Sequence, residues 1–170
     1  IRPHPANARP FAELAQSDQR VVVWPPNGQL PESDSMQADF QNSVQHATAV
    51  VGINTTAMID TLALGHPCVA IIIDQYEKTQ MRAEHFRHLF KSGALNVARG
   101  MNDAVAQLEA IASGDDNCAE ARLAFLSKFV RPQGMDVNAG EMVAAAVAEL
   151  GRGTKATNVC TIPVKQLVGA

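Results

Sequence analysis

The sequence is poor in cysteine, and its few cysteines are not arranged in pairs. Cys68, Cys118 and Cys160 are odd in number and widely spaced, and no CxxC motif is present. A small disulfide-stabilised domain would carry an even set of closely spaced cysteines. The cysteine pattern therefore predicts reduced thiols and a cytoplasmic protein.

Long apolar runs, a secretory signal and an excess of positive charge are also lacking. The longest strongly apolar stretches, residues 47–53 and 68–73, have the length of a strand and are far too short to span a bilayer. The formal net charge is -3 and the pI is near 5.9, whereas a non-specific nucleic-acid-binding domain is usually strongly basic. We therefore expect no nucleic-acid partner.

The remaining composition is that of a globular domain. The chain has 170 residues, 46% apolar and 18% charged, which is enough for one domain with a real hydrophobic core. The sequence lacks an initiator methionine, and Ile1 has the character of a strand end. We therefore expect the sequence to begin inside a longer protein, although a processed or trimmed chain would look the same.

Strand-like and helix-like segments alternate over the first hundred residues. β-Branched or continuous apolar runs predict strands at residues 20–24, 47–53, 67–73 and 94–98. Helical spacing of apolar residues predicts helices at residues 10–16, 37–46, 56–64, 79–91, 103–112, 118–129 and 140–150. The helix at 103–112 is expected to bury Val105, Leu108 and Ile111.

Strands that alternate with helices indicate βαβ units and a parallel sheet with right-handed crossovers. The predicted fold class is α/β, a Rossmann-like three-layer α/β/α domain with a mostly parallel sheet. This domain is expected over residues 1–150, with its first strand and helix missing, and residues 151–170 are expected to form a tail or arm.

Ligands of open α/β sheets bind at the carboxyl ends of the strands, so the polar residues after each strand are the candidate site. Asn54, Thr55 and Thr56 follow one predicted strand and open a helix, where backbone N–H groups and the helix dipole favour an anion. Asp60 lies one turn further on, within reach of a ribose. The alternative is that a threonine merely caps the helix and Asp60 is a solvated side chain.

A second candidate place is the turn at the start of the chain. Arg2 and His4 flank a turn stiffened by Pro3 and Pro5, and an arginine beside a rigidly held histidine suits a phosphate or another acidic group. The alternative is a proline-rich surface turn without a ligand.

Three further residues are weaker candidates for contacts with the sugar or base. Gln75 and Tyr76 follow the predicted strand at residues 67–73. His85 and His88 are three residues apart beside Glu84, which is a spacing that could suggest a metal, but no third ligand has convincing spacing. We therefore predict no metal and no cofactor. His85 is a candidate contact only through the family resemblance described below, which implies that this part of the chain borders the donor site.

The RPHP turn at residues 2–5, NTTAMID at residues 54–60 and LALGHPC at residues 62–68 together resemble the C-terminal, nucleotide-binding domain of GT-B proteins. Similar patterns occur in CDP-glycerol glycerophosphotransferases, in bacterial sialyltransferases with HP and double-serine motifs, and in UDP-N-acetylglucosamine 2-epimerases. The most extensive likeness is to bacterial GT-B glycosyltransferase-like proteins of surface-polysaccharide type. It covers roughly residues 1–145 and includes FVRPQGMD at residues 129–136.

The resemblance assigns roles to individual residues. It places His4 on a histidine that contacts phosphate or nucleotide, Thr55 and Thr56 on the double serine, and Asp60 on the acid that holds the ribose hydroxyls. It places the turn at residues 65–67 on a structural GKP turn. The epimerase pattern has a Gly-Gly pair and two adjacent acids where this chain has threonines and a single acid, which counts against epimerisation.

The resemblance implies a half of a glycosyltransferase, inactive alone, that binds a UDP-, CDP- or CMP-linked sugar or polyol. Its partner would be the N-terminal GT-B domain of the same protein, which supplies the catalytic residues, and the acceptor would hold the enzyme at the surface of the inner membrane. The alternatives are a UDP-sugar 2-epimerase-like domain and a non-enzymatic Rossmann-like interaction module.

Overall fold

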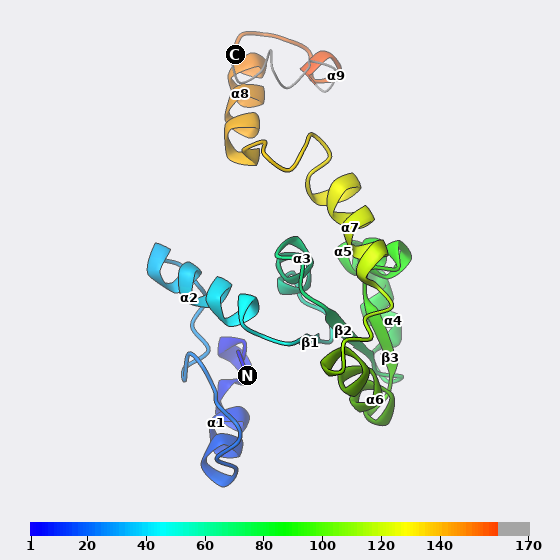
Figure 1. The fold of residues 1–170 in the computed structure, drawn as a ribbon. Coiled ribbons are helices and arrows are strands. Elements are labelled where there is room, and N and C mark those ends of the chain that lie inside the picture. Colours follow the sequence, from blue (N-terminus) through cyan, green and yellow to red (C-terminus); the bar gives the residue numbers. More distant parts are fainter. Residues whose placement is uncertain (160–170) are drawn as a thin grey trace. The chain divides into compact units, whose positions relative to one another are not determined.

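The computed structural model describes residues 1–159. The chain divides into two compact units, a first unit formed by Ile1–Ala47 and a second unit that begins at Thr48 (Figure 1).

The first unit is built from helices and turns. A short 3-10 helix, η1 (Pro5–Asn7), leads into α1 (Ala8–Ser17), and α2 (Asp34–Gln45) closes the unit. The α2 helix begins where the Ser33 hydroxyl accepts a hydrogen bond from the Met36 N–H, which is a regular N-cap. Both helices lie where the periodicity predicts them.

The strand predicted at residues 20–24 is not formed. Residues 20–24 form β-type backbone pairing only with Ile1. The Ile1 amino group donates to the Val22 carbonyl at 2.5 Å, and the Trp24 N–H donates to the Ile1 carbonyl at 2.9 Å. β-Branched residues favour a strand only when a partner strand packs beside them. Ile1 alone provides no such ladder within the unit, and the Val22 side chain stays 69% exposed.

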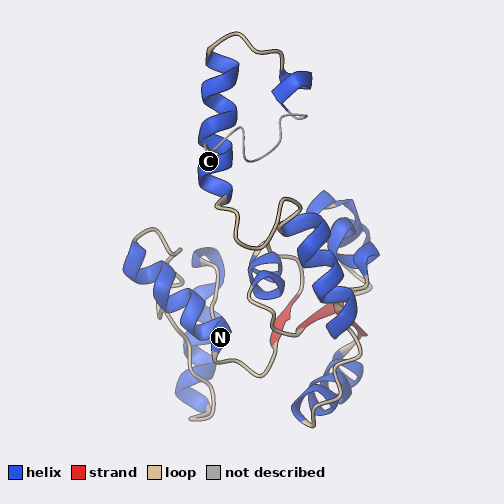
Figure 2. Cartoon of the chain, turned by 45° about the horizontal axis from the view of Figure 1, so that its top comes forward, coloured by secondary structure: helices blue, strands red, loops and turns tan. Residues whose placement is uncertain are grey.

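The second unit contains a parallel sheet. Its strands are β1 (Val50–Gly52), β2 (Cys68–Ile72) and β3 (Asn96–Arg99), in the order β1-β2-β3 (Figure 2). Val51 pairs with Val69 across β1 and β2, and Ala70 pairs with Val97 across β2 and β3. All three lie within or beside the predicted strands.

Helices connect and follow these strands in the expected order. They are α3 (Ala57–Ala63), α4 (Glu77–Arg82), α5 (Glu84–Ser92), α6 (Met101–Ala112), α7 (Ala119–Phe125), the π-helical turn η2 (Leu126–Val130), α8 (Ala139–Gly151) and α9 (Ala156–Val159). The predicted tail at residues 151–170 is described only as far as Val159, and Cys160 lies outside the described residues.

Two apolar clusters, one on each face of the sheet, hold the layers together. Alternate residues of β2 point to opposite faces, as a strand requires. On one face Cys68, Ala70 and Ile72 pack against Met58, Leu62, Phe86, Leu89 and Phe125 from α3, α5 and α7. On the other face Val69 and Ala98 pack against Ala104 and Ile111 from α6. The unit is therefore an α/β, Rossmann-like sheet flanked by helices on both faces, which confirms the predicted fold class.

Details of the helices differ from the prediction. The segment 79–91 is two helices, because Ala83 has an extended backbone with ψ 115°. The segment 118–129 ends in a π-helical turn rather than a continuous α-helix. In α6, Ile111 is buried and Leu108 packs against the same cluster, as predicted, but Ala104 takes the third buried position and Val105 is 50% exposed. Within residues 1–159, no helix has the length and apolar character needed to cross a membrane.

Candidate functional site

The loops that follow β1 and β2 are tied together by one buried side chain. Gln80, in α4, is 2% exposed. Its amide nitrogen donates to the carbonyls of Ile53 and Ile71, both at 2.9 Å, and its amide oxygen accepts from the Ile73 N–H at 3.2 Å. Gln80 therefore fixes the two loops at the carboxyl edge of the sheet, where α/β proteins bind ligands.

The role of Gln80 is not readable from the sequence. In the sequence, a buried glutamine cannot be distinguished from a solvent-exposed one. Only the three hydrogen bonds distinguish it, and each of them joins residues that are distant in the chain or on another element.

Asn54, Thr55 and Thr56 connect β1 to α3 at this edge. The Asn54 amide oxygen is buried and has no hydrogen-bond partner. The Thr55 hydroxyl accepts from the Ala57 N–H at 3.3 Å, whereas the Thr56 hydroxyl makes no cap bond to the helix. Buried acceptors are normally paired, so the Asn54 oxygen is available to accept a hydrogen bond from a ligand or water.

The start of α3 offers fewer free N–H groups than the sequence predicts. Besides the Ala57 N–H, the Met58 N–H donates to the Thr55 carbonyl at 3.1 Å and the Ile59 N–H to the Thr56 carbonyl at 2.8 Å. The first turn is therefore internally bonded. An anion at this place would be held chiefly by the side chains of Asn54, Thr55 and Thr56.

Asp60 is the acidic group of this place. The residue is exposed, and its carboxylate makes no hydrogen bond or ion pair with any residue in the described part of the chain. Neighbouring protein atoms still remove some of its hydration, which raises the pKa of the Asp60 carboxyl above its ordinary value. A carboxylate that lacks a protein partner has its acceptor oxygens available for a ligand hydroxyl.

The weaker candidates are placed differently from one another. Gln75 and Tyr76 lie in the loop after β2, and Tyr76 is 50% exposed, so both side chains are accessible at the carboxyl edge. His85 lies in α5, and its Nε2 atom is buried without a hydrogen-bond partner. His88 instead stacks on Phe129, with ring centroids 5.3 Å apart, and lies 3.4 Å from Glu84.

Arg2 and His4 belong to the first unit. The Arg2 guanidinium donates to Asp39 at 3.0 Å and to the Ser43 hydroxyl at 2.7 Å, and it lies over the Phe40 ring. Asp39 also accepts from the Trp24 indole at 2.7 Å. Much of the hydrogen-bonding capacity of Arg2 is therefore used inside the unit, where it connects the RPHP turn to α2.

His4 is the more available member of the pair. The side chain is exposed, and its Nδ1 accepts from the Ala6 N–H at 3.2 Å. In the neutral imidazole the proton must then sit on Nε2, which becomes a donor toward solvent or a ligand. The turn itself is held against Gly28, whose φ is +65°.

Metal ligands are not gathered in the described residues. Across residues 1–159, no group of three or more histidine, cysteine, aspartate or glutamate side chains could hold a metal ion. Cys68 and Cys118 are free thiols. Burial raises the pKa of Cys68 to about 12, although the charge of Arg122 acts in the opposite direction, so this thiol is not a nucleophile at neutral pH.

Comparison with protein-family models, curated proteins and solved structures finds no match for the chain. The fold class and the side chains at the carboxyl edge of the sheet are therefore the basis for a functional proposal.

Proposed function

We propose that the chain is the donor-nucleotide-binding part of a GT-B glycosyltransferase that acts in bacterial surface polysaccharide or glycoconjugate synthesis. The donor would be a sugar or polyol phosphate activated by UDP, CDP or CMP. The observation that carries the proposal is the Asp60 carboxylate, which has no hydrogen-bond or ion-pair partner among residues 1–159. It lies one turn beyond Asn54, Thr55 and Thr56 at the carboxyl end of β1.

Each of these groups suits one part of a nucleotide. Threonine hydroxyls donate to phosphate oxygens, and a carboxylate accepts from the two hydroxyls of a ribose. Donors directed at the diphosphate would stabilise the charge that develops on it as the sugar leaves. In this proposal the chain stabilises the departing diphosphate. An N-terminal GT-B domain supplies the catalytic base and binds the acceptor, so the chain alone has no transferase activity.

The proposed setting follows from the same chemistry. Nucleotide-activated sugars would be taken from the cytoplasm, and a polysaccharide or lipid-linked acceptor would bring the enzyme to the inner membrane surface. No cofactor or metal enters the proposed reaction.

A second function is favoured by a specific observation. The first-turn N–H groups of α3 are bonded internally, and Arg2 is engaged by Asp39 and Ser43. Both features suit a Rossmann-like interaction module, which needs a stable loop and no phosphate site.

Calorimetric titration of the chain with CMP, CDP, UDP and GDP separates these functions. We expect saturable binding of one nucleotide that weakens at least about tenfold in Thr56→Ala and in Asp60→Asn, since each loses about one hydrogen bond to a charged group. Thr48→Ala, at an exposed threonine outside the site, should bind as the parent does. Equal binding by all variants would show that the nucleotide binds at a different site. If neither the chain nor its full-length parent binds a nucleotide, the interaction module is favoured.

A further inference from the structure

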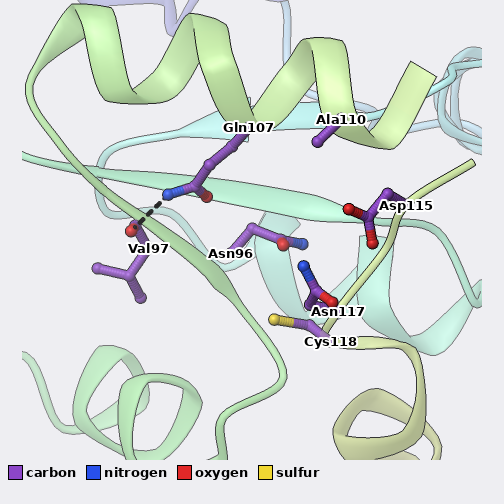
Figure 3. Close-up of a pocket in the computed structure, with 7 residues that line it drawn as sticks. All are labelled: Asn96, Val97, Gln107, Ala110, Asp115, Asn117 and Cys118. Carbon is purple, nitrogen blue, oxygen red and sulfur yellow. Dashed lines mark hydrogen bonds between the residues drawn. The ribbon is translucent and has the colours of Figure 1, made fainter. Parts of the chain in front are cut away.

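A cavity of about 280 Å³ lies at the opposite edge of the sheet from the candidate nucleotide site. Its walls are Asn96 and Val97 from the start of β3, Gln107 and Ala110 from α6, and Asp115, Asn117 and Cys118 from the loop that follows α6 (Figure 3). The proposed function makes no use of this cavity, and its chemistry can be read independently.

Gln107 presents a hydrogen-bond acceptor to the cavity. Its amide nitrogen donates to the Val97 carbonyl at 2.8 Å and to the Asp103 carboxylate at 3.1 Å. Both neighbours are acceptors, so the amide cannot be flipped without setting its oxygen against two other oxygens. The amide oxygen is therefore directed away from them, and it is buried with no partner.

Asn96 presents the complementary donor. Its amide nitrogen is also buried and makes no hydrogen bond of regular geometry, although it lies close enough to the Asp116 carboxylate to help lower the pKa of that group. Figure 3 shows its side chain directed toward Asp115 and Asn117. Asn117 contributes a second amide and Asp115 a carboxylate from the loop. A buried acceptor without a partner and a buried donor without a well-formed hydrogen bond, both lining one cavity, are costly unless a ligand or water pairs with them.

The charge and shape of the walls restrict the ligand. None of the lining residues is basic, and Asp115 carries a negative charge, so phosphates and other anions are repelled. Val97 and Ala110 add a small apolar surface. Neighbouring hydroxyls of a sugar ring each donate and accept, so they can pair with the Gln107 oxygen, the Asn96 and Asn117 amides and the Asp115 carboxylate together, while a C–H face of the ring rests on the apolar wall.

We propose that this cavity binds a vicinal diol of a hexopyranose, as a carbohydrate site separate from the nucleotide site. The ligand is a neutral sugar unit, free or at the end of a saccharide chain. Because no aromatic ring lines the cavity, the affinity is set by the hydrogen bonds and lies in the millimolar range.

The test is a titration of the isotopically labelled chain with D-glucose, D-mannose and N-acetyl-D-glucosamine, followed by nuclear magnetic resonance. We expect saturable shifts of the Asn96 and Asn117 side-chain amides and of the Ala110 backbone amide, and none at these positions with inorganic phosphate. A maltose titration distinguishes a free sugar from the end of a saccharide chain as the ligand, because a site for chain ends binds maltose at least as tightly as glucose.

Two α6 variants provide a matched pair. Ala110→Leu fills the cavity and should abolish the shifts, whereas Ala106→Leu makes the same change one turn earlier at an exposed position and should leave them intact. Asn117→Ala, on the exposed part of the loop, should weaken binding about tenfold while leaving the fold unchanged. Shifts that do not saturate, or that persist in Ala110→Leu, would overturn the proposal and leave the cavity occupied by water.

Discussion

At the scale of single residues, Gly28 shows how a backbone position can limit a side chain. Its φ is +65°, and a Cβ built there would lie 2.9 Å from the Pro3 carbonyl oxygen and 3.0 Å from backbone atoms of His4 and Pro5. Each contact is with backbone, which cannot swing away. The RPHP turn is therefore packed on a position that only glycine fits.

We predict that Gly28→Ala lowers the free energy of unfolding by about 2–4 kcal/mol, the sum of the left-handed conformation and the overpacking. Urea unfolding followed by circular dichroism, which reports on both units, measures it. The matched control is Gly65→Ala, where φ is +82° and nothing lies within 4 Å, so only the conformational cost of about 1–2 kcal/mol applies. An equal loss of unfolding free energy in the two variants would show that the RPHP turn shifts to accommodate the added methyl group.

A second residue-scale feature is the ion pair between Arg122 and Asp116. The two side chains are 8% and 17% exposed and 2.5 Å apart. Burial by itself raises the pKa of Asp116, but the hydrogen bond and charge of Arg122, helped by the Cys118 N–H and Asn96, more than offset it and leave the pKa below its ordinary value of 3.8. A depressed carboxyl pKa stabilises the fold above that value, and the stabilisation is lost as the pH falls through the folded-state pKa.

Asp116→Asn should therefore lower stability by about 3–5 kcal/mol at neutral pH, because it leaves a buried guanidinium unpaired. Its difference from the parent should begin to shrink as the pH falls below 3.8 and should be smallest below the lower pKa of the folded state, where the native carboxyl is neutral. Urea unfolding at both pH values checks this. Asp18→Asn is the control, since the Asp18–Arg20 pair is exposed and screened by solvent. A pH-independent difference for Asp116→Asn would exclude the ion pair as its cause.

At the scale of secondary-structure elements, the Gln80 bonds join α4 to the loops after β1 and β2. We predict that Gln80→Leu costs about 2–4 kcal/mol, because the Ile73 N–H and the Ile53 carbonyl lose their partner. Hydrogen exchange of the Ile73 amide should accelerate in proportion. Gln75→Leu, at an exposed position on the same edge, should change neither the stability nor the exchange rate of the Ile73 amide. An unaltered Ile73 exchange rate in Gln80→Leu would contradict the role of Gln80 in fixing the loops.

The same element explains where sequence reasoning about helices stops. Residues 79–91 contain no proline or glycine, so their pattern predicts one helix. The structure ends α4 at Arg82 and begins α5 at Glu84. In this arrangement Gln80 is buried in α4 while Phe86 and Leu89 reach the core from α5. The break at Ala83 accompanies tertiary packing, which no local pattern encodes.

At the scale of the whole molecule, the two units bury very different amounts of apolar surface. The second unit has a cluster on each face of its sheet, whereas Pro3 and Val44 are the only buried side chains of the first unit. A short chain with so small a core rarely folds without additional support.

We therefore predict that residues 48–170 fold alone and that residues 1–47 do not. Circular dichroism should show a cooperative thermal transition for the longer piece and a broad, non-cooperative one for the shorter. A cooperative transition in residues 1–47 would mean that the network around Arg2 and Asp39 stabilises the unit without a core.

The candidate site was predictable only in part at this scale. The alternation of strands and helices was sufficient to place Asn54, Thr55, Thr56, Gln75 and Tyr76 after strands, because parallel strands bring their carboxyl ends to one edge. Sequence spacing does not determine which atoms are paired or buried. It therefore could not predict the internal bonding of the first turn of α3, the ion pair between Arg2 and Asp39, or the burial of the His85 nitrogen. Nucleotide binding by these residues remains a prediction.

The sequence by itself determined the fold class and the order of the elements, because hydrophobic period and turn residues act over a few neighbours along the chain. It placed β1, β2 and β3 and the helices around them for that reason. Tertiary structure decided whether residues 20–24 form a strand, where residues 79–91 break, and which polar atoms are left unpaired at either edge of the sheet. Those outcomes depend on partners that are distant in sequence, and a strand without a neighbour or an amide without an acceptor is recognised only when the chain has folded.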